Sequence, residues 1–161
     1  MAVQRRMKIV DDNENSADSS MCIRVAFASN DMKNVNQHFG STKGLVIYGI
    51  NPDSSFLIEI AEFSVNHYEE NEDKLIDKIN VLKGCVGVYS QAVGSSAAKK
   101  LLIEGIQPIK VHEETCINVL IKYLQKELSQ GPSAWLARAI SHQNKYSIYY
   151  TENMGAESWE D

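Results

Sequence analysis

Residues 23–63 read IRVAFASNDMKNVNQHFGSTKGLVIYGINPDSSFLIEIAEF, and their pattern of apolar and polar residues indicates the fold class. It opens with the apolar run Ile23 to Ser29, which is typical of a short buried strand. Two more strands are predicted over Gly44 to Ile50 and Phe56 to Phe63, and the short turn NPDSS between them favours an antiparallel hairpin. The polar segment NDMKNVNQHFG has no helical period. The fold is therefore expected to start with three strands.

Helix and strand patterns alternate in the rest of the chain. The predicted elements are, in order, a helix between Asn71 and Gly84, a strand over Cys85 to Tyr89, a helix capped by Ser95 or Ser96 and ended by Gly105, a strand over Ile106 to Val111, a helix capped by Thr115 with an apolar stripe to Leu128, and a short helix over residues 134–140. This order indicates an α/β fold with a mixed five-stranded sheet and helices on both faces. A ribonuclease H-like three-layer fold fits it, whereas a flavodoxin-like sheet needs a helix between the first two strands.

The two ends of the chain lack an apolar period, and 161 residues suit one compact domain. Residues 1–21 are predicted to be a flexible tail, residues 22–142 a single folded domain, and residues 143–161 a second tail. Within that second tail, Tyr146, Ile148 and Tyr150 could instead form a short packed strand.

Composition excludes several classes of protein. The net charge is −5 and no region is basic, so nucleic acid is not an expected partner. No apolar run is long enough to span a bilayer, and no apolar stretch follows the basic residues near the N-terminus as a secretory signal requires. The three scattered cysteines form no disulfide or zinc framework. We therefore expect a reduced, cytoplasmic protein.

Two loops are expected to meet at the carboxyl ends of the parallel strands, where ligands gather in open α/β sheets. One loop, Asn30 to Thr42, carries His38, and the other, Ser90 to Ser96, leads into a helix N-terminus. A neutral imidazole beside exposed helix amides suits an anionic metal species. The alternatives are that Gly94 and the serines only cap the helix, and that His38 only bonds to backbone. No Ser-His-Asp set is recognisable, and the first strand lacks the acids of a two-metal nuclease.

Five motifs carry a family resemblance: RVAFASND, VNQHFG, YSQAVGSSA, GIQPIKV and GPSAWLARAI, between about Arg24 and Ile140. In this order they resemble the nitrogenase iron–molybdenum cofactor biosynthesis family (the NifX, NafY and NifB C-terminal type of domain). The resemblance implies a ribonuclease H-like fold and a non-enzymatic carrier. Its cargo would be an iron–sulfur precursor of the cofactor, of the NifB-cofactor type, received from NifB and passed to the NifE–NifN scaffold.

The resemblance also implies a site. The histidine of the H-F-G motif is a cluster ligand in relatives, which maps onto His38. The cluster-binding residues expected around it are Asn36, Gln37, Phe39, Gly40, Gly94, Ser95 and Ser96. A competing hypothesis is a sensor or enzyme that binds a small phosphorylated ligand at the Gly94–Ser96 helix terminus, although neither common phosphate-loop motif occurs. A protein-interaction module that uses the Trp135 helix is a third hypothesis.

Overall fold

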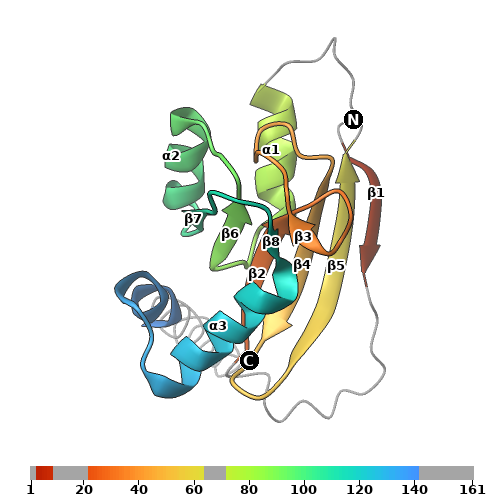
Figure 1. Ribbon diagram of the computed structural model, residues 1–161. Coiled ribbons are helices and arrows are strands. Elements are labelled where there is room, and N and C mark those ends of the chain that lie inside the picture. Colours follow the sequence, from red (N-terminus) through yellow and green to blue (C-terminus); the bar gives the residue numbers. More distant parts are fainter. Residues whose placement is uncertain (1–2, 9–21, 64–71, 142–161) are drawn as a thin grey trace, which may run out of the picture. The chain divides into compact units, whose positions relative to one another are not determined.

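The structure of the protein is a computed structural model, and it describes residues 3–8, 22–63 and 72–141 (Figure 1). The chain divides into two compact units, residues 1–131 and residues 132–161. In the second unit the described part includes a helix over 134–141, which matches the short helix predicted there. The tail predicted over 143–161 lies outside the described residues. Within the described ranges, every helix is too short or too polar to cross a bilayer.

The first unit is built on a mixed sheet of six strands. They lie in the order β1 (Val3–Lys8), β5 (Ser55–Phe63), β4 (Gly44–Ile50), β2 (Ile23–Ala28), β6 (Gly87–Ser90) and β7 (Gln107–Lys110). Neighbours from β1 to β2 pair antiparallel, whereas β2, β6 and β7 pair parallel. Asn51 closes the β4–β5 hairpin, because its side-chain carbonyl accepts the amides of Asp53 (2.9 Å) and Ser54 (2.6 Å). The predicted mixed α/β architecture and hairpin are confirmed.

The sheet has one strand more than the five predicted, and the extra strand is β1. It lies in the segment 1–21 that the sequence predicted to be a flexible tail, and it pairs with β5 at the edge of the sheet. The strand VQRRMK has no apolar alternation that would reveal it. An ion pair stabilises it instead: the Arg6 guanidinium contacts the carboxylate of Glu59, whose side chain is only 1% exposed. The tail prediction is therefore wrong for Val3–Lys8.

Three described helices belong to the first unit, namely α1 (Glu72–Val81), α2 (Ser95–Ile103) and α3 (Ile117–Gln130). Two predicted caps need correction. The N-cap of α2 is Gly94, and within the part of the chain that the structure describes no side chain caps this helix. The N-cap of α3 is Cys116, because Thr115 and Cys116 form strand β8. That strand pairs with β3 (Asn34–Val35), and the two form a separate two-stranded sheet. The strand β3 lies inside the segment predicted as a loop.

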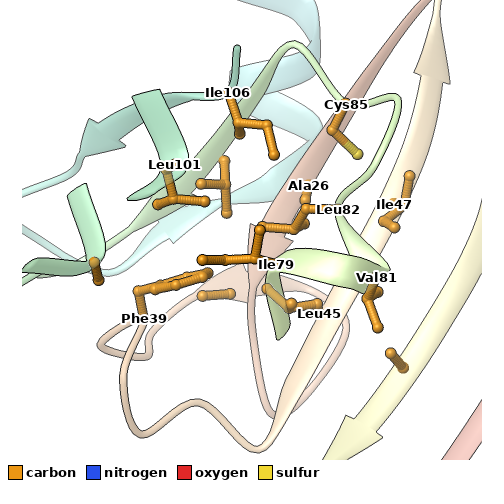
Figure 2. Packing of buried hydrophobic residues seen from close by; sticks show 14 of the residues in the cluster. Ala26, Phe39, Leu45, Ile47, Ile79, Val81, Leu82, Cys85, Leu101 and Ile106 are labelled. Carbon is orange, nitrogen blue, oxygen red and sulfur yellow. The ribbon is translucent and has the colours of Figure 1, made fainter. Parts of the chain in front are cut away.

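Helices cover both faces of the main sheet. Figure 2 shows the core on one face, where α1 and α2 pack on β2 and β4 through Ala26, Leu45, Ile47, Ile79, Leu82 and Leu101. Alternate side chains of a strand face opposite sides, so Phe27 of β2 points to the other face and stacks on Tyr89 at a centroid distance of 5.3 Å. The helix α3 lies over this second face. Burial, and then the nearby Glu127 of α3, raise the pKa of Tyr89.

Candidate functional site

The loops that follow β2 and β6 are bonded to each other. The Phe39 amide donates to the Ala92 carbonyl (2.8 Å), and the Gln91 amide donates to the Gln37 carbonyl (2.9 Å). His38 and Ala92 form a parallel bridge between them. Since β2 and β6 are parallel neighbours, this bridge lies beyond their carboxyl ends. The structure thus brings together the two segments that the sequence predicted would meet.

Asp31 shapes the start of the first loop. Its Oδ1 accepts the amides of Lys33 (2.8 Å) and Asn34 (2.9 Å) and the hydroxyl of Ser29 (2.9 Å). These bonds hold the pKa of the Asp31 carboxyl well below its ordinary value, and the two bonds from backbone amides have the largest effect. Between them Met32 adopts a left-handed conformation with φ 65°. The loop is therefore fixed by its own hydrogen bonds before it reaches His38.

Asn36 and Gln37, which the resemblance placed around a cluster, have side chains that bond within the loop. The Asn36 amide nitrogen donates to Oδ1 of Asn30 (2.8 Å), and its own Oδ1 accepts the Asn30 backbone amide (3.2 Å). The Gln37 Oε1 accepts the Lys43 amide (3.3 Å), and its Nε2 donates to the Asn36 carbonyl (3.2 Å). Both side chains are half-buried. They fix the conformation of the loop on either side of His38.

His38, Phe39 and Gly40 differ sharply in exposure. His38 and Gly40 are exposed, whereas Phe39 is 0% exposed and lies in the core, among the side chains of Figure 2. A ring buried in this way does not reach a ligand at the surface, and a role of Phe39 in cluster binding stays a prediction. Phe39 instead anchors the loop in the core. The imidazole next to it stays at the surface.

Lys78 of α1 is a site residue that the sequence analysis missed. Its side chain is 4% exposed, and its Nζ donates to the carbonyls of Gly40 (2.6 Å) and Phe39 (3.4 Å). The Nζ also lies 5.4 Å from the ring centroid of Phe63. Burial first, and then the charge of Lys74, lower the pKa of Lys78 to about 8. The signal was present in the sequence, because a lysine three residues after Leu75 falls on the apolar stripe of the helix.

The second loop ends at the N-terminus of α2. Gly94, Ser95 and Ser96 are exposed, and a methyl group added at Gly94 would meet no atom within 4 Å. Because the N-cap is Gly94, the prediction that Ser95 or Ser96 caps this terminus is wrong. The amides of the first turn have no carbonyl partner within the helix, and the helix dipole makes this end positive. The free amides of such an end can donate hydrogen bonds to an anion.

No group of three or more His, Cys, Asp or Glu side chains that could hold a metal ion occurs within the described ranges. Cys85 lies in the core, and burial raises the pKa of its thiol to about 12. Cys116 is half-buried as the N-cap of α3. Of the candidate ligands, His38 therefore has the exposed position at the junction of the two loops.

Comparisons with known proteins reveal close relatives. The family described as "Dinitrogenase iron-molybdenum cofactor" matches residues 21–127. Protein NifX of Azotobacter vinelandii is 45% identical over 157 residues, 98% of this chain and 97% of that protein. Protein NifX of Sinorhizobium fredii (strain NBRC 101917 / NGR234) is 32% identical over 143 residues, 85% of this chain and 89% of that protein. Protein NifY of Azotobacter vinelandii is 27% identical over 130 residues, 81% of this chain and 53% of that protein.

A solved structure is also similar. The crystal structure of PH0822 superposes with a TM-score of 0.52 at 25% sequence identity, and the match covers 65% of this chain and 89% of that one. The superposition indicates that the two chains share a fold over the matched region. The family match includes the whole of the first loop, the β6–α2 segment and His38. With a matched family over most of its length and a relative that spans nearly all of it, this protein belongs to the dinitrogenase iron-molybdenum cofactor family.

Proposed function

We propose that this protein is a non-enzymatic carrier of an iron–sulfur precursor of the iron–molybdenum cofactor, of the NifB-cofactor type. It would receive the cluster from NifB and deliver it to the NifE–NifN scaffold. Its NifX and NifY relatives support a role in cofactor biosynthesis for nitrogen fixation. The cargo, the two partners and a cytoplasmic location are parts of the proposal.

The observation that carries the proposal is the junction of the two loops. An exposed imidazole, His38, lies on a loop bonded to the segment that leads into an uncapped helix N-terminus. A neutral imidazole nitrogen binds iron, and backbone amides donate hydrogen bonds to the sulfides of an anionic cluster. Ser95 and Ser96 add exposed hydroxyl donors at the same terminus. The imidazole is suited to an iron atom of the cargo, whereas the amides and the hydroxyls are suited to its sulfides.

A carrier must also release its cargo. A site made of four thiolates encloses a metal and gives it up slowly, whereas one imidazole with several hydrogen-bond donors can exchange its ligand with a receiving protein. The exposed position of His38 leaves the cluster accessible to such a receiver. These features favour transfer over permanent storage, and they require no catalytic group.

The proposed fold name rests on the strand order. Without β1, the sheet runs β5-β4-β2-β6-β7, which in chain order is third, second, first, fourth, fifth. The first three of these strands pair antiparallel and the last two continue parallel to β2. This order supports a ribonuclease H-like domain with β1 added at one edge.

The uncapped terminus of α2 also favours a second candidate function, the binding of a small phosphorylated ligand. The two candidates differ in what His38 does, because a phosphate at the helix terminus does not need an imidazole as a ligand. Binding of nucleotides or inorganic phosphate by the His38→Ala variant, without binding of cluster by the wild type, would favour this second candidate.

The direct test is an anaerobic titration of the full chain with NifB-cofactor-type cluster. His38→Ala is expected to weaken binding about tenfold or more, since the variant loses a metal ligand. The matched control is His112→Ala, because His112 is also exposed but lies in the segment after β7. Circular dichroism should show unchanged folding in both variants. Full cluster affinity in folded His38→Ala would overturn the assignment of His38.

A further inference from the structure

We infer that Lys78 is the positioning residue of the cluster site: its buried side chain holds the carbonyls of Phe39 and Gly40 and thereby fixes the loop that presents His38. The inference rests on the proposed function, since it concerns the same site. Lys78 belongs to α1 and lies 38 residues after Gly40 in the chain. It is therefore a tertiary support of the loop and not a part of the loop itself.

The contacts of Lys78 meet the chain directly after the proposed ligand. Phe39 and Gly40 are the next two residues after His38, and Nζ donates to both carbonyls, at 3.4 Å and 2.6 Å. Two donors from one ammonium restrict the orientation of two successive peptide planes. On the amide side, Phe39 is held by its bond to Ala92. The segment after His38 is thus held from both the β6–α2 segment and α1.

Gly40 makes this support necessary. It is exposed, and a methyl group in place of its hydrogen would meet no atom within 4 Å, so side-chain packing does not restrain it. Glycine also has the largest conformational freedom of any residue. Among the described contacts of Gly40, the bond from Lys78 at 2.6 Å is the one that fixes its carbonyl. Without that bond, the backbone two residues after His38 would sample more conformations.

Packing alone does not explain a lysine at this position. Burial disfavours the charged form, as the lowered pKa shows, and the charge of Lys74 adds to the effect. An apolar side chain on this stripe of α1 would avoid the desolvation of an ammonium. What a lysine supplies, and an apolar residue does not, is a set of donors long enough to reach the two loop carbonyls. Its contribution is therefore to the geometry of the loop.

The test compares Lys78→Met with Lys74→Met in the full chain. Methionine is similar in length to lysine but has no donor and no charge. Lys74→Met removes the same charge one turn earlier in α1. Amide hydrogen exchange by NMR is measured without any cluster at Phe39 and Gln91, whose bonds join the two loops, and at Val86, which bonds to the Arg24 carbonyl within the sheet.

In Lys78→Met, exchange at Phe39 and Gln91 is expected to be about tenfold faster while exchange at Val86 stays within about twofold, because one charge-assisted contact of the loop is lost. Lys74→Met should leave all three amides unchanged. Equal acceleration at Val86 would show a general loss of stability, and no acceleration at Phe39 would show that Lys78 does not hold the loop; either result overturns the inference. Should Lys78→Met fail to fold, Lys78→Leu is judged by the same criteria.

A second arm connects the loop to binding. Anaerobic titration with NifB-cofactor-type cluster should show an affinity about tenfold lower for Lys78→Met than for Lys74→Met, the effect expected when the support of a metal ligand is removed. Equal affinities would overturn the positioning role. If the wild type binds no cluster, the proposed function fails, whereas the exchange measurement still decides whether Lys78 holds the loop.

Discussion

Three consecutive residues of the first loop have three different environments. His38 is exposed, Phe39 is buried in the core, and the Gly40 carbonyl is bonded to the ammonium of Lys78. The buried ring and the buried ammonium hold the backbone on the side away from solvent. The backbone of His38 itself forms the bridge to Ala92. The imidazole is therefore presented at the surface by a backbone that is held in place.

The lowered pKa of Lys78 predicts a dependence of stability on pH. The pKa is about 8 in the folded chain and about 10.4 in an unfolded one, so the folded state binds fewer protons between these values. The desolvation penalty is fully present below pH 8 and is relieved as the pH rises toward 10. The free energy of unfolding of the wild type should therefore rise, relative to that of Lys78→Met, from pH 8 to pH 10.

Urea denaturation at several pH values in this range measures the difference. The comparison with Lys78→Met removes the contribution of other groups whose ionisation differs between the folded and unfolded chains in this range, such as Cys85 and Tyr89, whose pKa values burial raises in the folded chain. A difference between the two proteins that stays constant with pH would show that Lys78 keeps an ordinary proton affinity in the folded chain.

At the residue scale, sequence patterns predicted that the loop of His38 would meet the loop before α2, because strand polarity places both loops at one edge of the sheet. They did not predict the roles of the neighbours of His38. Whether Phe39 points outward or into the core depends on how the loop turns, and this turn is fixed by Asp31 and by the bridge to Ala92. The contact from Lys78 joins residues that are far apart in the chain. Spacing along the sequence does not reveal such a contact.

At the scale of elements, apolar content decided which strands were predictable. The buried strands β2, β4 and β6 have apolar runs and were all predicted. In contrast, β1 is polar and is stabilised by a charged pair with β5, and β3 and β8 are only two residues long. Neither kind of strand has a hydrophobic period, so sequence patterns predicted a tail, a loop and a helix cap in their places.

The Arg6–Glu59 pair should make a measurable contribution to the free energy of unfolding of the first unit. Arg6→Met leaves a carboxylate that is 1% exposed without its guanidinium partner. The loss is expected to lower the free energy of unfolding by about 1 kcal/mol, because the Arg6 side chain is 41% exposed and water screens its charge. The double variant Arg6→Met/Glu59→Gln should be less destabilised than the sum of the two single variants, because it leaves no unpaired charge. Strictly additive losses in urea denaturation would show that the two side chains do not interact.

At the scale of the whole molecule, the N-terminal segment belongs to the folded unit that carries the site. Deleting residues 1–20 removes β1, exposes the edge of β5 and leaves Glu59 without Arg6. We expect a lower melting temperature for this variant, whereas deleting residues 143–161 should leave the melting temperature of the first unit nearly unchanged. Thermal denaturation of the two truncated chains tests both expectations. Equal melting temperatures in wild type and the N-terminal deletion would contradict the structural role of β1.

The central claim is that the protein carries a metal cluster by means of His38. The most direct measurement is the iron content of the full chain after anaerobic purification from cells that also produce NifB, for the wild type, His38→Ala and His112→Ala. We predict several iron atoms per chain in the wild type and in His112→Ala, and a strong loss of iron in a folded His38→Ala variant. Iron-free wild type, or iron content in His38→Ala equal to that of the wild type, would contradict the claim.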